Sequence, residues 1–232
     1  MSDIEMDEIF GWSVKAWSRP FLCAIEDFPV PESADILEIG ASSYSAVSLY
    51  FLDKRRRLDI TTYPEDLVPG LRKLVARHCA LDAGSPRIAC MSAMDVAGSY
   101  DLVLMKSVLG GLFRQGRGST DEVNALIARI VENNVRPGGA LITLDNGATV
   151  IEPLFSRFGA RANRWRYFVP SDFTGCTRQY GFGLLSSFSL VTRFGRLGKL
   201  PEDLLHALDR SIFALWRVSR PSVIVSVYSK PA

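Results

Sequence analysis

The chain has 232 residues, of which 47% are hydrophobic and 22% charged, so it can bury a sizeable core and does not have the composition of a disordered segment. Its formal net charge of +2 is too balanced to favour nucleic acid as a partner. The acidic first residues lack the basic and apolar regions of a signal peptide, and no apolar run reaches the ~18 residues that a membrane span needs. We therefore expect one domain over residues 1–232.

Four cysteines and two histidines are scattered along the chain, without any Cys-x-x-Cys pair. His78 beside Cys79 is the one adjacency, and this spacing does not favour a metal site. Free thiols are typical of reducing compartments, so we expect a cytoplasmic protein without a metal.

The first segment, residues 1–33, is expected to form a helical cap that Pro20 interrupts. Trp12 and Trp17 supply large aromatic surfaces in this segment. They either pack on the sheet as part of the core or form a lid over a ligand pocket.

The stretch from Asp35 to Ile39 is continuously apolar apart from Glu38, as in a strand covered on both faces. Gly40 follows, and then a predicted helix that the basic run 54–57 closes. A buried carboxylate needs a partner, so we expect Glu38 at the edge of a pocket. A strand that enters a helix through a glycine is where open α/β sheets place their first nucleotide crevice.

Further strands and helices alternate along the chain. Strands are expected at 58–63, 87–91, 101–105 and 140–144, with helices after Pro64 and after the capping box that Ser119 and Glu122 form. Two late strands at 183–191 and 222–228, separated by a helix at 201–218, fit an antiparallel hairpin at the sheet's edge. The pattern predicts an α/β fold with a doubly wound, mostly parallel seven-stranded sheet.

Three segments in this order resemble class I S-adenosylmethionine-dependent methyltransferases: Ile36–Gly40, Tyr100–Leu104 and Arg136–Leu141. The resemblance implies a Rossmann-like methyltransferase fold with a cofactor-binding core at 34–145 and a substrate-side insertion with edge strands at 146–232. It also implies S-adenosyl-L-methionine as cofactor and methyl transfer to a glycan or small-metabolite acceptor, at oxygen. The segments 106–111 and 165–167 are similar to bacterial methyltransferases associated with surface-polysaccharide genes.

The chain departs from the family pattern at three places. The first loop normally reads Gly-x-Gly-x-Gly, but here it reads Gly40-Ala41-Ser42-Ser43-Tyr44. Thr62 stands where an acid usually binds the ribose, and Ser92 stands where an aspartate usually receives the adenine amino group. The resemblance assigns cofactor contacts to Glu38, Gly40, Ala41, Ser43, Tyr44, Thr62, Tyr63, Ala93, Met94 and Ser107. We expect Tyr44 to border the pocket and the backbone amides of 40–43 to supply the main contacts there.

Lys106 ends the fourth strand, where ligands meet open α/β sheets. A desolvated lysine can act as a base or orient an anionic substrate, although it could equally reach solvent beside the crevice. His206 lies among leucines, which favours packing over catalysis. Trp165, Arg166 and Tyr167 offer an indole, a guanidinium and a phenol to a substrate, or form an ordinary packed connection.

Two functions remain open at this point. One is an active methyltransferase, and the other is a non-catalytic binding or scaffolding protein that keeps the fold and has lost the cofactor. A nicotinamide oxidoreductase is disfavoured because Gly-x-Gly-x-x-Gly is absent. The oligomeric state stays open, with a homodimer as one option.

Overall fold

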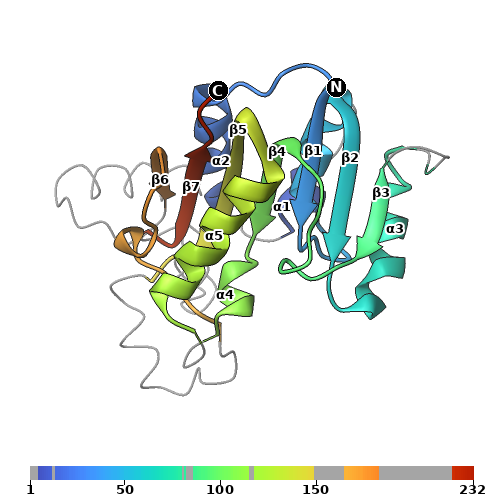
Figure 1. Cartoon of the computed structure of the whole chain (residues 1–232). Coiled ribbons are helices and arrows are strands. Elements are labelled where there is room, and N and C mark those ends of the chain that lie inside the picture. Colours follow the sequence, from blue (N-terminus) through green and yellow to red (C-terminus); the bar gives the residue numbers. More distant parts are fainter. Residues whose placement is uncertain are drawn as a thin grey trace.

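A computed structural model describes residues 5–11, 14–79, 81, 86–114, 118–148, 165–182 and 221–232. Seven strands of this described part form one sheet in the order β3-β2-β1-β4-β5-β7-β6 (Figure 1). The parallel strands are β1 (Ala34–Ile39), β2 (Arg55–Thr62), β3 (Arg87–Cys90), β4 (Tyr100–Lys106) and β5 (Val135–Asn146). The antiparallel strands are β7 (Val223–Ser229) and β6 (Arg178–Phe182). The predicted fold class is confirmed.

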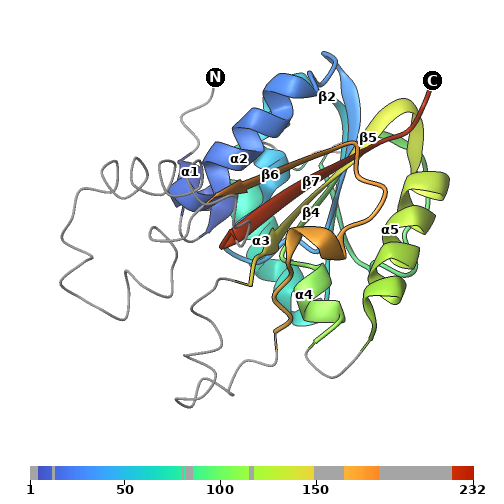
Figure 2. The same ribbon diagram turned by 90° about the vertical axis from the view of Figure 1, so that its left-hand side faces the viewer.

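Helices cover both faces of the sheet (Figures 1 and 2). One face is packed by α1 (Met6–Phe10), α2 (Val14–Asp27), η1 (Val47–Lys54) and α3 (Val68–Val75), with η2 (Glu65–Leu67) leading into α3. The other is packed by α4 (Leu109–Leu112) and α5 (Thr120–Asn134), and η3 (Pro170–Asp172) lies in the connection before β6. None of the helices in the described ranges is long and apolar enough to cross a membrane.

Pro20 does not interrupt the first helical segment, as the sequence led us to expect, but lies inside α2. A proline in a helix interior costs about 3 kcal/mol. Trp17, Phe21 and Ala24 of α2 are fully buried against the sheet, and burial of two aromatic side chains offsets that cost. Trp12 and His206 lie outside the described residues, and so do the whole of the predicted strand at 183–191 and the whole of the predicted helix at 201–218.

The basic run 54–57 does not close a helix either. Lys54 ends η1, whereas Arg55–Arg57 open β2, and Ala34 of β1 pairs with Arg55. Pairing with β1 keeps these residues in the sheet, and within β2 the Arg57 guanidinium donates to Asp59, two residues along the same strand face.

The capping box at the start of α5 is confirmed. The Ser119 hydroxyl accepts from the Glu122 N–H at 3.2 Å, and the Glu122 carboxylate accepts from the Ser119 N–H at 2.5 Å. This local signal depends on neighbouring residues alone, which is why sequence could predict it.

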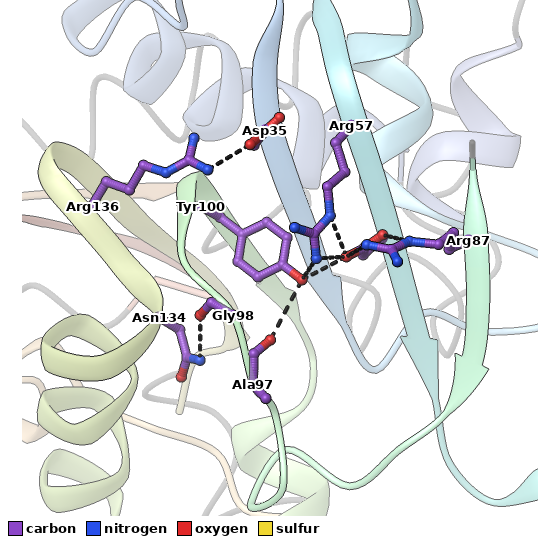
Figure 3. Close-up of polar contacts among 9 residues, drawn as sticks. Asp35, Arg57, Arg87, Ala97, Gly98, Tyr100, Asn134 and Arg136 are labelled. Carbon is purple, nitrogen blue, oxygen red and sulfur yellow. Dashed lines mark hydrogen bonds and ion pairs between the residues drawn. The ribbon is translucent and has the colours of Figure 1, made fainter. Parts of the chain in front are cut away.

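An ion-pair network ties the starts of the parallel strands together, at the edge opposite their carboxyl ends (Figure 3). Asp59 accepts hydrogen bonds from Arg57, from Arg87 at 2.8 Å and from the Tyr100 hydroxyl at 2.6 Å. Burial and the hydrogen bond to Asp59 raise the pKa of Tyr100 to about 12. Beside it, Arg136 reaches Asp35 at 2.5 Å and Asp101 at 2.9 Å, which links β5 to β1 and β4.

Candidate functional site

Three ionisable residues lie at the carboxyl ends of β1, β4 and β5: Glu38, Lys106 and Asp145. Glu38 pairs in register with Leu104, two residues before Lys106, and Lys106 pairs with Leu144 beside Asp145. Lys106 and Glu38 lie on the face covered by α2 and η1, whereas Asp145 faces the backbone of α4 on the other side of the sheet. In Figure 1, α4 lies just beyond the end of β4.

Glu38 has the hydrogen-bond partners that a buried carboxylate requires. Its carboxylate accepts from the N–H groups of Val47 and Ser48 at 2.9 and 2.8 Å, and from the Ser48 hydroxyl at 2.5 Å. These bonds satisfy the first turn of η1 and compensate the carboxylate's negative charge. Burial still raises the pKa of Glu38, against the lowering effect of these hydrogen bonds and of Lys106.

Lys106 lies on the face covered by α2. Its Nζ is 4.9 Å from the centroid of the Trp17 ring, a cation–π distance. Burial lowers the pKa of Lys106 to about 8, and the negative charges of Glu38 and Asp145 oppose this shift. A lysine with such a pKa exchanges its proton readily near neutral pH, as a general base requires.

Asp145 is the residue at these strand ends that the sequence did not indicate. Its side chain is 1% exposed, and neither carboxyl oxygen makes a hydrogen bond of good geometry to the described residues. Burial raises its pKa to about 7, although the backbone N–H groups of Gly110 and Leu109, the Thr143 hydroxyl and the Lys106 cation lower it. Its place at the end of a predicted strand, level with the end of the strand that carries Lys106, was the available signal.

The first loop uses its backbone amides within the protein. The N–H groups of Gly40 and Ala41 both donate to the Thr61 carbonyl, at 3.0 and 2.9 Å, and the Ser42 N–H donates to the Ser45 carbonyl at 3.0 Å. Three of the four amides expected to face a cofactor are therefore engaged within the protein, and their contact with a cofactor stays a prediction. Gly40 has φ +78°, and a Cβ there would lie 2.5 Å from the Val108 side chain, so glycine is required.

The side chains expected to contact the adenosine part of the cofactor fall into two groups. Thr62 is buried, and its hydroxyl donates to the Ala41 carbonyl at 2.6 Å, so it braces the loop. Tyr63, next in the chain, is 68% exposed. Met94, after β3, is 51% exposed beside the buried Ala93. Tyr63 and Met94 thus offer free surface beyond the ends of β2 and β3.

Ser43 and Tyr44 lie against helices of the α1–α3 face. A Cβ on Gly70 of α3 would lie 2.5 Å from the Ser43 Cβ, and one on Gly11 would lie 2.9 Å from the Tyr44 ring. The Tyr44 side chain is 58% exposed. Its place at the pocket's border stays a prediction.

Ser107 follows Lys106 in a left-handed conformation with φ +56°, which is unfavourable for a serine. Its N–H donates to the Leu144 carbonyl at 2.7 Å, while its buried Oγ has no hydrogen-bond partner among the described residues. Strain of this kind gathers at functional sites.

The segments 106–111 and 165–167, which resemble methyltransferases associated with surface-polysaccharide genes, pack against each other. The Trp165 indole lies on Gly110 and Gly111, where any Cβ would come within 2.3 to 2.8 Å of it, and the Arg166 N–H donates to the Gly110 carbonyl at 3.0 Å. The Arg166 guanidinium donates to the Gly118 carbonyl at 3.2 Å and to the Thr120 hydroxyl at 2.7 Å. Arg166 is thus committed to structure, and Tyr167 is the exposed member of the three.

Comparison with known proteins identifies the fold. No protein-family model matches the chain, and no curated protein matches its sequence. Among solved structures, a Galdieria sulphuraria protein assigned as a sarcosine dimethylglycine methyltransferase is 12% identical, with a TM-score of 0.59 over 94% of this chain and 86% of that one.

Two further solved structures are similar to this chain in fold. Magnesium protoporphyrin IX methyltransferase from Synechocystis PCC 6803, solved with bound SAH, is 14% identical with a TM-score of 0.57, over 94% of this chain and 88% of that one. A Haloferax volcanii protein assigned as a methyltransferase, in complex with the Trm112 activator, is 15% identical with a TM-score of 0.56, over 98% and 97% of the two chains. The chain therefore has the Rossmann-like fold of S-adenosylmethionine-dependent methyltransferases.

Proposed function

We propose that the protein is an S-adenosylmethionine-dependent methyltransferase whose acceptor is a glycan or a small metabolite. The observation that carries the proposal is the placement of Glu38, Lys106 and Asp145 at the carboxyl ends of β1, β4 and β5, where both carboxyl side chains are buried. Ligands of open α/β sheets bind at this edge. A methyltransferase fold with a purely structural role would have no need to bury poorly compensated charge there. The scattered free cysteines support a cytoplasmic location.

The residues present fit the cofactor in part. Beyond β2 and β3, the exposed Tyr63 offers an aromatic face to an adenine ring, and Met94 offers apolar surface, while its sulfur accepts from the Arg129 guanidinium at 3.6 Å. At the other end, the unpartnered Oγ of Ser107 and the carboxyl of Asp145 await a polar ligand. We assign the adenosine half to Tyr63, Ala93 and Met94, and the methionine half to the space between Gly40 and Ser107.

The cofactor would supply a methyl group activated by a good leaving group. The protein would then hold the acceptor in line in a site with little water. Lys106 is the residue that we assign to the acceptor's proton, because burial places its pKa close to the working pH. Tyr167 is the exposed side chain that we assign to acceptor binding, while Trp165 shapes the surface beneath it.

A non-catalytic binding protein is the second candidate. It is favoured by one observation, the internal use of the Gly40 and Ala41 amides and of the Thr62 hydroxyl. These groups cannot serve a ligand without local rearrangement.

Calorimetric titration of the full chain with S-adenosylmethionine separates the two candidates. The methyltransferase proposal expects saturable heat at micromolar to millimolar cofactor, corresponding to roughly −4 to −8 kcal/mol of binding free energy. Tyr63→Ala should weaken binding, whereas Tyr50→Ala, on the buried side of η1, serves as a control for folding changes alone. Absence of heat at millimolar cofactor would leave the binding-protein candidate.

A further inference from the structure

The first loop is anchored at both of its ends, which leaves a short turn between the anchors. On one side, the N–H groups of residues 40–41 donate to the Thr61 carbonyl. On the other side, the Glu38 carboxylate accepts from the N–H groups of residues 47–48. Residues 42–46 lie between these anchors, and we call them the closed turn.

The closed turn is held together by Ser42. Its N–H donates to the Ser45 carbonyl at 3.0 Å, and its hydroxyl accepts from the Ser45 N–H at 3.0 Å. The hydroxyl oxygens of the two serines also lie 3.0 Å apart. Such local hydrogen bonds compete with other uses of the same backbone groups. A ligand that needs the amides of this turn therefore requires the turn to open.

Helix α1 lies directly against the closed turn. The Ala46 N–H donates to the Glu8 carbonyl at 3.0 Å. Gly11 ends α1 with φ +77°, and a Cβ there would lie 2.9 Å from both the Ser45 hydroxyl oxygen and the Tyr44 ring. Because packed groups at such distances cannot shift independently, the turn opens only if this end of α1 moves.

Glu8 also ties α1 to the helix on the other side of the turn. Its carboxylate oxygens lie 2.5 Å from a guanidinium nitrogen of Arg77 and 2.7 Å from His78 Nε2, just beyond the end of α3. The side chains of Glu8 and His78 are only 16% and 12% exposed, so salt screens their contact weakly. α3 meets the same turn through Gly70, where a Cβ would lie 2.5 Å from the Ser43 Cβ. Glu8 therefore joins α1, the closed turn and α3.

α1 has little stability of its own. It has five residues, and its N-cap residue Glu5 makes no side-chain capping bond. Isolated helices of this length do not persist in water. Burial of Ile9 and Phe10 and the contacts of Glu8 stabilise it in the fold. Segments that depend on few contacts are the first to open locally, which suits α1 to a movable role.

We propose that α1 is a strap over the first loop, and that the contacts of Glu8 with Arg77 and His78 keep this strap shut. When these contacts are released, α1 lifts and the closed turn opens toward the crevice at the carboxyl end of β1. The inference rests on the proposed function, to which it adds control of cofactor entry. The internal hydrogen bonds of the closed turn then belong to the shut state of a two-state element.

Hydrogen–deuterium exchange of the full chain without ligand tests the strap. In Glu8→Gln, which keeps the size of the side chain and removes its charge, the amides of residues 42–46 should exchange roughly tenfold faster than in the wild type. The matched control is Glu5→Gln, the same substitution at the exposed N-cap of α1, which should leave this exchange unchanged. Adding His78→Gln to Glu8→Gln should have little further effect, because both substitutions remove the same contact.

Three results of the exchange experiment would overturn the inference. The first is equal exchange of residues 42–46 in Glu8→Gln and the wild type. The second is an equal rise in Glu5→Gln, which would show that any loss of charge on α1 has this effect. The third is a rise that extends equally to α5, which would indicate general destabilisation instead of a local opening.

Calorimetric titration with S-adenosylmethionine tests whether the strap controls entry. Glu8→Gln should bind the cofactor roughly three- to tenfold more tightly than the wild type, because a larger fraction of the protein is open to it. Equal binding would overturn the inference, and weaker binding would do so by showing that α1 forms part of the binding surface. If neither protein binds the cofactor while exchange rises in Glu8→Gln alone, the proposed function fails and the strap stands without it.

Discussion

The ammonium group of Lys106 lies over the face of the Trp17 indole ring, 4.9 Å from its centroid. Trp17 belongs to α2, so the N-terminal helices contribute a wall of the site as well as part of the core. Trp17 is fully buried, as the core role requires, and a lid role for the N-terminal aromatics stays a prediction. A cation–π contact stabilises a desolvated ammonium group by about 2 kcal/mol, which is less than the several kcal/mol that the loss of hydration costs.

Lys106 should give protein stability a distinct dependence on pH. Its pKa is lowered from 10.5 to about 8 in the folded protein, so between these values the unfolded chain binds more protons. The free energy of unfolding of the wild type, relative to Lys106→Met, should therefore rise with pH from about 8 to about 10.5. Urea unfolding monitored by circular dichroism across this window measures it, and a flat difference would mean that Lys106 is solvated.

Asp145 should act in the opposite direction and in another window. Its pKa is raised from 3.8 to about 7, so between these values the folded protein binds more protons. Relative to Asp145→Asn, the wild type should lose stability as pH rises from about 4 to about 7 and then show no further change. A thermal-shift series over pH tests this. A variant that is less stable than the wild type at pH 7 would point to a structural cap on α4.

Gly40 should tolerate no side chain. Gly40→Ala places a methyl group 2.5 Å from Val108 in a left-handed conformation and should cost about 2–4 kcal/mol of unfolding free energy. Gly138 is the matched control, since it has the same φ of +78° and nothing within 4 Å of its Cβ position. Gly138→Ala should cost only about 1 kcal/mol, as measured by urea unfolding. Equal losses in the two variants would show that Val108 does not crowd Gly40.

Asp59 should be the most sensitive residue at the opposite edge of the sheet. Burial alone would raise its pKa, but hydrogen bonds from Arg57, Arg87 and Tyr100 lower it. Asp59→Asn leaves two guanidinium groups without their carboxylate and should cost about 2–4 kcal/mol. Tyr100→Phe removes one donor and should cost about 1 kcal/mol.

The pH dependence separates this network from ordinary surface pairs. Because the folded-state pKa of Asp59 is depressed, its contribution is present above the unfolded value of 3.8 and is lost as pH falls below it. The difference between wild type and Asp59→Asn should therefore shrink in acid, as chemical unfolding would show. A difference that stays constant down to the most acidic conditions would contradict the assignment.

Sequence predicted the features of this fold that depend on neighbours along the chain. The capping box of Ser119 and Glu122 and the strand-glycine unit at Gly40 are of this kind. Pro20 and the Arg55–Arg57 run were misjudged because burial against the sheet, and pairing with β1, override local propensity.

Sequence predicted where the residues of the site lie along the chain, but not which groups they contact in the fold. Lys106 and Glu38 could be placed at strand ends, but their environments depend on contacts across the fold. The environment of Asp145 depends on Ile224, its pairing partner on β7, which is 79 residues away in sequence. The same holds for Thr62, whose hydroxyl is used by the loop that it was expected to serve.

Hydrogen–deuterium exchange of the full chain, with and without saturating S-adenosylmethionine, tests the central claim most directly. We expect slower exchange in residues 91–96 and 106–112, the loops after β3 and β4, which flank the proposed cofactor, while exchange around Asp59 and Arg136 stays unchanged. Unchanged exchange throughout, or protection confined to other segments, would contradict a cofactor site at the carboxyl ends of β1 and β4.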